Sequence, residues 1–347
     1  MRYHVIPRTG LRVSELCLGA MTFGTAWGPM GADRETSLAM MRRFAEAGGN
    51  FIDTANNYQG GESERIVGEF VRSERDRFVL ASKYTLNTSK NDPNAWGNHR
   101  KNLRRAVDAS LARLGTDHLD LLYVHIWDFT TAPEEVMRGL EDVTRAGKVL
   151  HVGASDTPAW VVSRANAIAD RYGWNPFSFV QVEYSLLTRE VEHEIVPMAN
   201  ALGIAVAAWG ALGFGVLSGK HGGASPDSGR SEWVKARLAD PRTQRIVGAL
   251  TEVAHGAGCP PAQAALAWIR SRPGLVLPIV GVRKPAHLED ALGSLDVTLT
   301  SEQVAKLDAA SAIPPSFPGR MWADEKLVDA HITGGTHWSL AGWRRPC

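Results

Sequence analysis

Short apolar runs alternate with amphipathic segments along most of this chain, and that alternation restricts the possible folds more than any other feature. The runs include 51–53, 78–83 and 119–125, and their β-branched and aromatic residues favour strands. The segments between them place apolar residues at helical spacing, and one of them ends at Gly115, a typical helix C-terminal cap. Strands joined through helices run parallel and are buried on both faces, so the sequence predicts a parallel sheet.

About eight such strand-and-helix units fit into the 347 residues, and eight units close into a (β/α)8 barrel. We therefore expect one α/β barrel domain, a TIM barrel, over 1–347, with an open doubly wound sheet as the alternative. Residues 1–15 are expected to form a hairpin around Thr9 and Gly10. The tail, 311–347, is rich in Pro, Gly and Trp, and we expect it to lie over the active-site mouth of the barrel.

Charge and cysteine content exclude several functional classes. The formal net charge is +1 without any lysine or arginine run, which argues against nucleic acid, acidic partners and membrane surfaces. No apolar stretch reaches the length of about 20 residues that a membrane-spanning helix needs. The three cysteines lack CxxC spacing, so neither a disulfide framework nor a metal site is expected. With no apolar signal core at the N-terminus, a reducing cytoplasm fits best, for a monomer or a homo-oligomer.

Polar side chains end three consecutive strands of the predicted barrel. Asp53 ends the second strand, Lys83 the third and His125 the fourth, while Tyr58 follows Asp53 by five residues. Each has an ordinary structural explanation, namely a helix cap, a surface lysine, a hydrogen-bonded core histidine and a surface aromatic residue. Active sites of such barrels lie at the carboxyl ends of the strands, so all four together indicate catalysis rather than structure.

Other catalytic motifs are missing from the sequence. No GxGxxG follows the first strand, and the segment GFGVLSGK fails the spacing of a phosphate-binding P-loop. HxxH, HExxH and GxSxG are absent as well, which argues against a metallohydrolase, a serine hydrolase or a barrel lyase.

Seven motifs, found in order along nearly the whole chain, resemble those of the aldo-keto reductase superfamily. They are LGAMTFG, DTANNYQGGESE, ASK, YVHIWD, GAS, FVQVEYSLL and GLVLPIVGVRKPAHLEDALG. The chain is most similar to the branch with the potassium-channel β-subunits and many bacterial aldo/keto reductases. The resemblance implies a (β/α)8 barrel and an NAD(P)H-dependent oxidoreductase that reversibly reduces an aldehyde or ketone to the alcohol. A redox-sensing regulatory subunit that binds NADPH and turns over slowly is the alternative.

By this resemblance, the catalytic tetrad consists of Asp53, Tyr58, Lys83 and His125. Tyr58 is expected to give the proton, and the Lys83 ammonium is expected to lower its pKa from the value of about 10 of a free phenol. Asp53 is expected to pair with Lys83, because a buried ammonium without a carboxylate is unfavourable. His125 is expected to donate a hydrogen bond to the substrate oxygen.

The resemblance also assigns a site for NADPH or NADP+, with NADH left possible. Ser155, Asp156 and Gln181 correspond to the family's contacts with the nicotinamide carboxamide, although Asp156 stands where the family has Asn, so Ser155 has to supply the donor. Trp209 stands where the family commonly stacks a Tyr on the ring. The other expected cofactor contacts are Gly19, Met21, Thr22, Gly210, Leu212, Phe214, Gly215, Lys220, Gly281, Arg283, His287 and Asp290.

The adenosine end of this site leaves the cofactor preference open. Arg283 and Lys284 are fixed cations that favour a 2′-phosphate, hence NADP over NAD, unless they only form a solvated helix start. The family usually has Glu-Asn where this chain has Asp290 and Ala291, so an amide contact with the adenosine is lost.

The loops that follow the strands are rich in aromatic residues. The candidates for the substrate mouth are Phe23, Trp27, Trp96, Trp127, Phe129 and, from the tail, Trp322. Such a mouth suits a bulky or flat carbonyl compound, while ordinary packing is the alternative for each residue.

Overall fold

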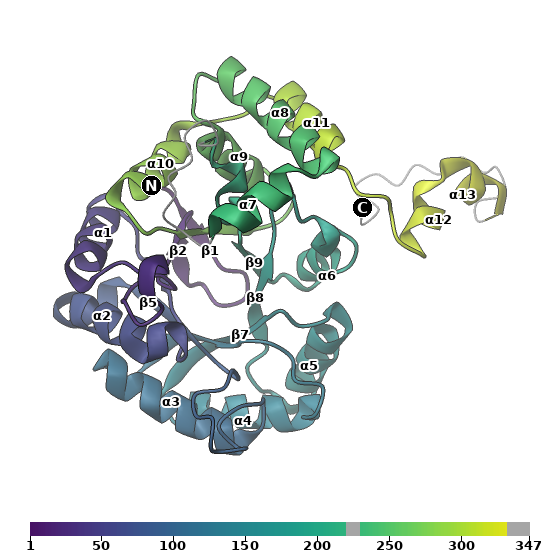
Figure 1. Ribbon diagram of the computed structural model, residues 1–347. Helices are drawn as coiled ribbons and strands as arrows, with labels where there is room; N and C mark the ends of the chain where they lie inside the picture. Colours follow the sequence, from purple (N-terminus) through teal and green to yellow (C-terminus); the bar gives the residue numbers. More distant parts are fainter. Residues whose placement is uncertain (220–229, 332–347) are drawn as a thin grey trace.

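Eight parallel strands close into a barrel in the computed structural model, which describes residues 1–219 and 230–331. The strand order around the barrel is β10-β3-β4-β5-β6-β7-β8-β9, which confirms the predicted (β/α)8 architecture and excludes the open sheet (Figure 1). The strands are β3 (Cys17–Gly19), β4 (Phe51–Asp53), β5 (Val79–Tyr84), β6 (Leu119–Val124), β7 (Val149–Ser155), β8 (Phe177–Glu183), β9 (Ala205–Trp209) and β10 (Val276–Gly281).

Helices surround the barrel as an outer ring (Figure 1). They are α1 (Arg34–Glu46), α2 (Glu62–Val71), α3 (Arg100–Leu114), α4 (Pro133–Arg145), α5 (Ala159–Tyr172), α6 (Ile195–Leu202), α7 (Arg230–Leu238), α8 (Pro241–Gly256), α9 (Pro261–Arg270), α10 (Pro285–Gly293) and α11 (Ser301–Ser311). Short 3-10 helices are η1 (Gly28–Met30), η2 (Tyr58–Gly61), η3 (Arg72–Arg77), η4 (Glu190–Glu192), η5 (Gly213–Ser218) and η6 (Ser294–Asp296). None of the helices in the described part of the chain has the length and apolar character to cross a membrane.

Local signals set several helix ends. Asp33 caps α1, because its side chain accepts a hydrogen bond from the Thr36 amide. Gly115 ends α3 in the left-handed conformation, as the sequence indicates. Pro133 and Pro285 begin α4 and α10, where a missing amide hydrogen costs no intrahelical bond.

Apolar side chains fill both sides of the strands. One cluster lies inside the barrel and includes Phe179, whose ring centroid lies 5.8 Å from that of Phe51 and 6.3 Å from that of Tyr123. A larger cluster lies between the strands and the helices. Burial on both faces explains why the strands read as continuous apolar runs rather than as alternating ones.

The N-terminal hairpin closes one end of the barrel. Strands β1 (Tyr3–Val5) and β2 (Arg12–Ser14) pair antiparallel, as predicted. Ile6 and Val13 are fully buried in the interior cluster together with Cys17, which begins β3. The hairpin therefore covers the amino ends of the strands and leaves their carboxyl ends open.

The C-terminal segment differs from the expectation over its described part. Helices α12 (Gly319–Ala323) and α13 (Glu325–His331) extend away from the ring and do not cover the barrel (Figure 1). Phe317 is 69% exposed. Residue Ser311, the last of α11, is held by Arg189 and Arg242 at the outer side of the barrel, so the chain leaves it outward. Residues 332–347 lie outside the described part.

Candidate active site

The ammonium group of Lys83 is the centre of the strand-end cluster. Lys83 is 1% exposed, and its Nζ donates to Asp53 Oδ2 at 2.5 Å, to the Thr54 carbonyl at 2.8 Å and to Tyr58 Oη at 3.1 Å. All three N–H donors are therefore used. Burial lowers the pKa of Lys83, but Asp53 and Tyr58 more than offset it, so the pKa lies above its ordinary value and the group is charged.

Asp53 is fixed from two sides. Its Oδ2 accepts from Lys83, and its Oδ1 accepts from Gln181 Nε2 at 2.9 Å. Gln181 was expected at the nicotinamide carboxamide, whereas in this structure its amide N–H holds the aspartate. No local pattern indicates this contact, since the two residues are 128 positions apart on opposite strands. The contact between Lys83 and the Thr54 carbonyl could not be predicted from the sequence either, because every residue has a backbone carbonyl.

Tyr58 begins η2 and lies half-buried between two other rings. Its ring contacts His125 edge-on with centroids 5.8 Å apart, and Trp27 at 6.3 Å. Burial raises the pKa of Tyr58 above its ordinary value, although Lys83 opposes this effect. The expected net lowering of this pKa by Lys83 is therefore wrong for the protein without cofactor or substrate. The hydroxyl is protonated at neutral pH and can act as a proton donor.

His125 follows β6 and completes the cluster. Its backbone N–H donates to the Tyr84 carbonyl at 3.0 Å, which fixes the residue at the strand end. Burial, followed by the Lys83 charge, holds the pKa of His125 well below its ordinary value, so the imidazole is neutral. Its buried Nδ1 has no hydrogen-bond partner among the described residues. A neutral imidazole carries one N–H, which suits it to donate to an uncharged or developing oxygen.

Backbone strain gathers at the same end of the barrel. Six described residues other than glycine have positive φ angles, and five of them follow barrel strands: Gln59, Thr85, Phe129, Asp156 and Phe214. Thr85 is β-branched and has φ 116°, a conformation that such residues rarely adopt. Each such backbone conformation destabilises the folded state by about 1–3 kcal/mol, and residues of this kind cluster at functional sites.

Asp156 and Trp209 meet at the ends of β7 and β9. Trp209 Nε1 donates to Asp156 Oδ1 at 3.1 Å. The Asp156 side chain faces the open mouth, yet the surrounding protein withdraws enough water to raise its pKa to about 6. Glu183 raises this pKa further, whereas the Trp209 N–H and Lys83 oppose the shift. Ser155, the preceding residue, is buried at the end of β7.

The glycine-rich turn after β9 has three successive positive φ angles. Gly213, Phe214 and Gly215 in η5 have φ angles of 53, 55 and 103°, and the N–H groups of Gly213 and Gly215 donate to the Gly210 and Leu212 carbonyls at 2.7 and 3.0 Å. Phe214 contacts Trp209 edge-on at 6.1 Å. Leu212 begins this turn, and Gly210 follows β9 directly. Lys220 lies outside the described residues.

The first and last barrel strands lie side by side. Gly19 and Gly281 end β3 and β10 and face each other in the parallel register. Thr22 Oγ1 donates to the Val282 carbonyl at 2.6 Å, which ties the two following loops together. The Met21 carbonyl accepts from Gln59 Nε2 at 3.2 Å. These expected cofactor contacts therefore form one connected edge of the mouth.

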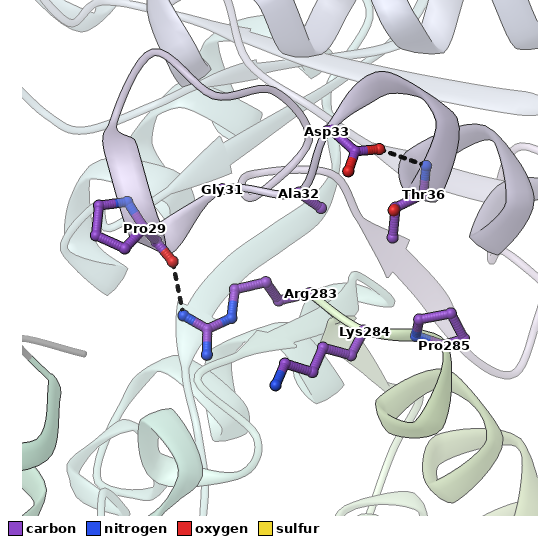
Figure 2. Close-up of a pocket in the computed structure, with 8 residues that line it drawn as sticks. All are labelled: Pro29, Gly31, Ala32, Asp33, Thr36, Arg283, Lys284 and Pro285. Carbon is purple, nitrogen blue, oxygen red and sulfur yellow. Dashed lines mark hydrogen bonds between the residues drawn. The ribbon is translucent and has the colours of Figure 1, made fainter. Parts of the chain in front are cut away.

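A pocket of about 470 Å³ lies beyond this edge, between the loop that precedes α1 and the start of α10 (Figure 2). Arg283 and Lys284 line it, and Arg283 Nη1 donates to the Pro29 carbonyl at 2.8 Å. Asp33 lines the same pocket, with its carboxylate engaged as the cap of α1. His287 and Asp290 lie on α10. Two cations at a pocket of this size suit a phosphate.

The predicted substrate residues divide into exposed and buried ones. Trp27, Trp96 and Phe129 are 38, 44 and 72% exposed. Phe23 and Trp127 are buried in the cluster between strands and helices, so they have little surface for a substrate, and the prediction of direct contact is not supported for them. The side chain of Trp322 lies outside what the structure describes.

Polar residues of the same motifs hold the exposed aromatic loops, which the sequence reasoning missed. Gln59 Oε1 accepts from the Trp27 amide at 2.7 Å, and Glu62 Oε2 accepts from the Thr25 amide at 2.8 Å. Asp128 Oδ2 accepts from the Asn98 amide at 2.7 Å, which joins the loop of Trp96 to that of Phe129. The sequence could have indicated these residues, because they lie inside the motifs QGGESE and YVHIWD.

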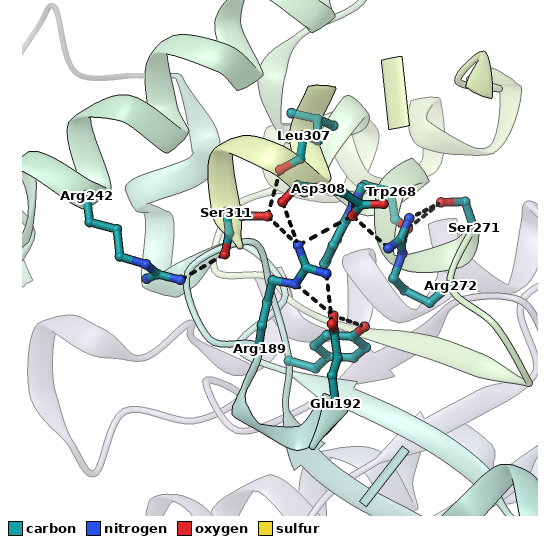
Figure 3. Close-up of polar contacts among 10 residues, drawn as sticks. Arg189, Glu192, Arg242, Trp268, Ser271, Arg272, Leu307, Asp308 and Ser311 are labelled. Carbon is teal, nitrogen blue, oxygen red and sulfur yellow. Dashed lines mark hydrogen bonds and ion pairs between the residues drawn. The ribbon is translucent and has the colours of Figure 1, made fainter. Parts of the chain in front are cut away.

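A second cluster of charges anchors the loop after β8 (Figure 3). The Arg189 guanidinium donates to both Glu192 oxygens at 2.8 Å and to Ser311 Oγ at 2.8 Å. Tyr184 Oη donates to Glu192 at 2.7 Å, and the Tyr184 amide donates to the Trp209 carbonyl at 3.0 Å. The cluster therefore supports the chain beside Trp209 from outside the mouth.

Across residues 1–219 and 230–331, His, Cys, Asp and Glu do not gather in any group of three or more that could hold a metal ion.

Comparison with known proteins places the site in a wider context. The sequence profile of the Aldo/keto reductase family matches residues 15–312. The chain is 42% identical over 327 residues to norsolorinic acid reductase A of Aspergillus parasiticus, covering 91% of this chain and 83% of that protein. It is 38% identical over 348 residues to a putative aryl-alcohol dehydrogenase of Saccharomyces cerevisiae, covering 96 and 92%. An aldo-keto reductase of Aspergillus calidoustus is 37% identical over 331 residues, covering 91 and 84%.

Proposed function

The chain belongs to the aldo/keto reductase family, a family of oxidoreductases that act on carbonyl compounds, and we propose that it reduces a flat aromatic ketone or aldehyde with NADPH. Tyr58 gives the proton in this reaction, Lys83 stabilises the negative charge that the proton leaves behind, Asp53 holds Lys83 in place, and His125 orients the carbonyl.

The contact between Lys83 Nζ and Tyr58 Oη carries this proposal. At 3.1 Å it joins a neutral hydroxyl to an ammonium, and it strengthens when the hydroxyl loses its proton. Lys83 thus stabilises the transition state more than the ground state, as catalysis requires. Asp53 and the Thr54 carbonyl prevent the ammonium from moving, so no reorganisation is needed at the moment of proton transfer.

The reaction balances with these groups. A bound reduced nicotinamide supplies a hydride, two electrons and one proton, to the carbonyl carbon. The C=O π pair moves to oxygen, which takes the proton of Tyr58 Oη and becomes the alcohol hydroxyl. Lys83 stabilises the tyrosinate until a proton from solvent restores it. His125, neutral because it is buried, donates its N–H toward the oxygen as charge develops there.

The described residues fit a dinucleotide phosphate. The half-buried indole of Trp209 suits a nicotinamide ring, and the turn at Phe214 and Gly215, with its positive φ angles, suits close approach of the backbone to a pyrophosphate. Arg283 and Lys284 line a pocket that suits the 2′-phosphate. We therefore favour NADPH over NADH.

Aromatic residues at the mouth support an aromatic substrate. Trp27 lies against Tyr58 and exposes flat apolar surface beside the proton donor, and Trp96 and Phe129 expose further aromatic surface in the loops that follow the strands. The names of two similar proteins, a norsolorinic acid reductase and an aryl-alcohol dehydrogenase, agree with this substrate class.

The Tyr58→Phe variant tests the proposal. We expect kcat for an aromatic aldehyde to fall at least about a thousandfold, because the acid is lost, while the Kd of NADPH measured by tryptophan quenching stays unchanged. Tyr172→Phe, a change at an exposed ring on α5, is the matched control. Near-normal turnover of Tyr58→Phe would exclude Tyr58 as the acid, and equal Kd values for NADPH and NADH in the unmodified protein would exclude the 2′-phosphate assignment.

A further inference from the structure

Two carboxylates stand at the ends of strands β7 and β8, on the same side of the barrel as the tetrad. Asp156 follows β7, and Glu183 ends β8 with its Cα paired in register to Trp209. Within residues 1–219 and 230–331, neither of them forms an ion pair. Lys83 is the cation that acts on Asp156, but its charge is already balanced by Asp53 at 2.5 Å. Asp53 and Lys83 together are neutral, so Asp156 and Glu183 leave this part of the mouth negative.

This negative charge distinguishes the two redox forms of a nicotinamide. The oxidised ring is a cation and the reduced ring is neutral, so a carboxylate beside the ring stabilises only the oxidised form. A chain of hydrogen bonds joins Asp156 to the tetrad. The Asp156 backbone N–H donates to the Gln181 carbonyl at 3.1 Å, and the Gln181 side chain donates to Asp53 at 2.9 Å, beside Lys83 and Tyr58. A nicotinamide ring that gives its hydride to a carbonyl held by Tyr58 would therefore lie on the side of the mouth where Asp156 stands.

We propose that Asp156 is a charge-selecting residue, whose carboxylate makes the site prefer NADP+ to NADPH and so favours transfer of the hydride to the carbonyl. This inference rests on the proposed function, because it requires the nicotinamide to be held at Trp209 and Asp156. It goes beyond a carboxamide contact, since it assigns the residue an effect on the redox equilibrium of the bound cofactor.

Asparagine would preserve every feature of Asp156 except its charge. The amide oxygen of Asn can accept from Trp209 Nε1 as the carboxylate Oδ1 does at 3.1 Å. Asp156 has φ 42°, and Asn adopts the left-handed region as readily as Asp. The Asp156→Asn variant therefore keeps the indole contact and the backbone, and it isolates the charge.

The charge of Asp156 also responds to pH in the neutral range. Burial, and to a smaller extent Glu183 on β8, raise its pKa to about 6, while the Trp209 N–H on β9 and Lys83 on β5 act in the opposite direction, and Tyr58 in η2 stays protonated. The carboxylate form exists above this pKa. The preference for NADP+ is thus present at about pH 8 and lost as the pH falls through about 6.

Fluorescence titrations of the full chain with NADP+ and with NADPH test the proposal. We expect the ratio of the Kd of NADPH to the Kd of NADP+ to fall about tenfold, or about 1.4 kcal/mol, in Asp156→Asn at pH about 8. In the unmodified protein the ratio should fall similarly between pH about 8 and pH about 5. The ratio cancels protonation of the 2′-phosphate, which both forms share. Asp170→Asn, which removes an exposed carboxylate paired with Arg8, is the matched control.

The outcomes separate this inference from the proposed function. If both cofactors bind and Asp156→Asn leaves the ratio of their Kd values unchanged, the charge-selecting role is overturned and the reductase function is kept. No binding of either cofactor to the unmodified protein would overturn both. If the variant does not fold, the pH dependence of the unmodified protein is the test. A ratio of Kd values that is constant from pH about 5 to about 8 then overturns the proposal.

Discussion

Two clusters of buried charge in this barrel differ in what their charged groups can still do. In the mouth, Lys83 is held by Asp53 and contacts Tyr58, whose proton can leave. Behind the mouth, Arg189 binds Glu192 and Ser311, and its partners have no reaction to take part in (Figure 3). Hydrogen bonds of 2.5 to 3.1 Å hold both clusters, so hydrogen bonding alone does not distinguish a catalytic group from a structural one. The distinguishing feature is a contact with a half-buried group that has a proton to exchange.

The choice of cation follows the same division. A guanidinium has a rigid planar fork, stays charged and can stack on rings, and Arg189 lies 5.3 Å from the Trp268 centroid while Arg272 lies 4.2 Å from it. An ammonium is a compact charge that three acceptors can surround, which Asp53, Thr54 and Tyr58 do. In the proposed mechanism, lysine therefore serves where charge has to be concentrated at one reacting oxygen.

The largest expected effect is that of Lys83→Met. We expect kcat to fall at least about a thousandfold, because the tyrosinate loses its counter-charge. The variant should also lose about 3 kcal/mol of unfolding free energy, since Asp53 is left buried without a cation. Denaturant unfolding and steady-state kinetics measure the two effects.

The double variant Asp53→Asn/Lys83→Met separates these effects. It removes both charges, so stability should return to within about 1 kcal/mol of the unmodified protein while activity stays lost. If activity recovered together with stability, Lys83 would be a structural cation like Arg189, and the division between the clusters would fail.

Arg189→Met is expected to give the opposite pattern. It leaves Glu192 without its cation, whereas Asp308 keeps Arg272 at 2.8 Å, and because Glu192 is partly open to solvent we expect a loss of about 2 kcal/mol of unfolding free energy. Turnover per folded molecule should change less than about threefold. A large loss of kcat at temperatures where the variant is folded would mean that the cluster positions Trp209 for catalysis.

Tyr184→Phe is a smaller perturbation of the same cluster. It removes the hydroxyl that donates to Glu192 at 2.7 Å, and Arg189 still satisfies that carboxylate. We expect a loss of about 1 kcal/mol in unfolding free energy and unchanged cofactor affinity, measured by denaturant titration and by fluorescence. A weaker affinity for NADPH would show that the hydroxyl also holds the Tyr184 backbone, which donates to the Trp209 carbonyl.

The two clusters also differ in how far the sequence predicted them. Asp53, Lys83 and His125 stand at the ends of apolar runs, where a charge is unexpected, and the barrel brings strand ends together. Arg189 meets Ser311 over 122 positions, and Gln181 meets Asp53 over 128, so both contacts depend on tertiary register that one sequence does not contain. Phe23 and Trp127 lie in the expected loops, but their side chains turn into the core. Residue type indicates the chemistry of a side chain and not its direction.

The smallest expected effect is the response of turnover to alkaline pH, and it tests the balance of forces on Tyr58. Burial raises the pKa of Tyr58 and Lys83 lowers it, with burial dominant. The acid form is required for reduction, so activity is present below this pKa and lost above it. We expect kcat/KM for reduction to vary less than about twofold between pH about 7 and about 9, a window above the pKa of about 6 of Asp156. A tenfold fall per pH unit that begins near pH 7 would mean that Lys83 outweighs burial once cofactor and substrate are bound. Lys83 would then act by generating tyrosinate in advance rather than by stabilising it as the proton leaves.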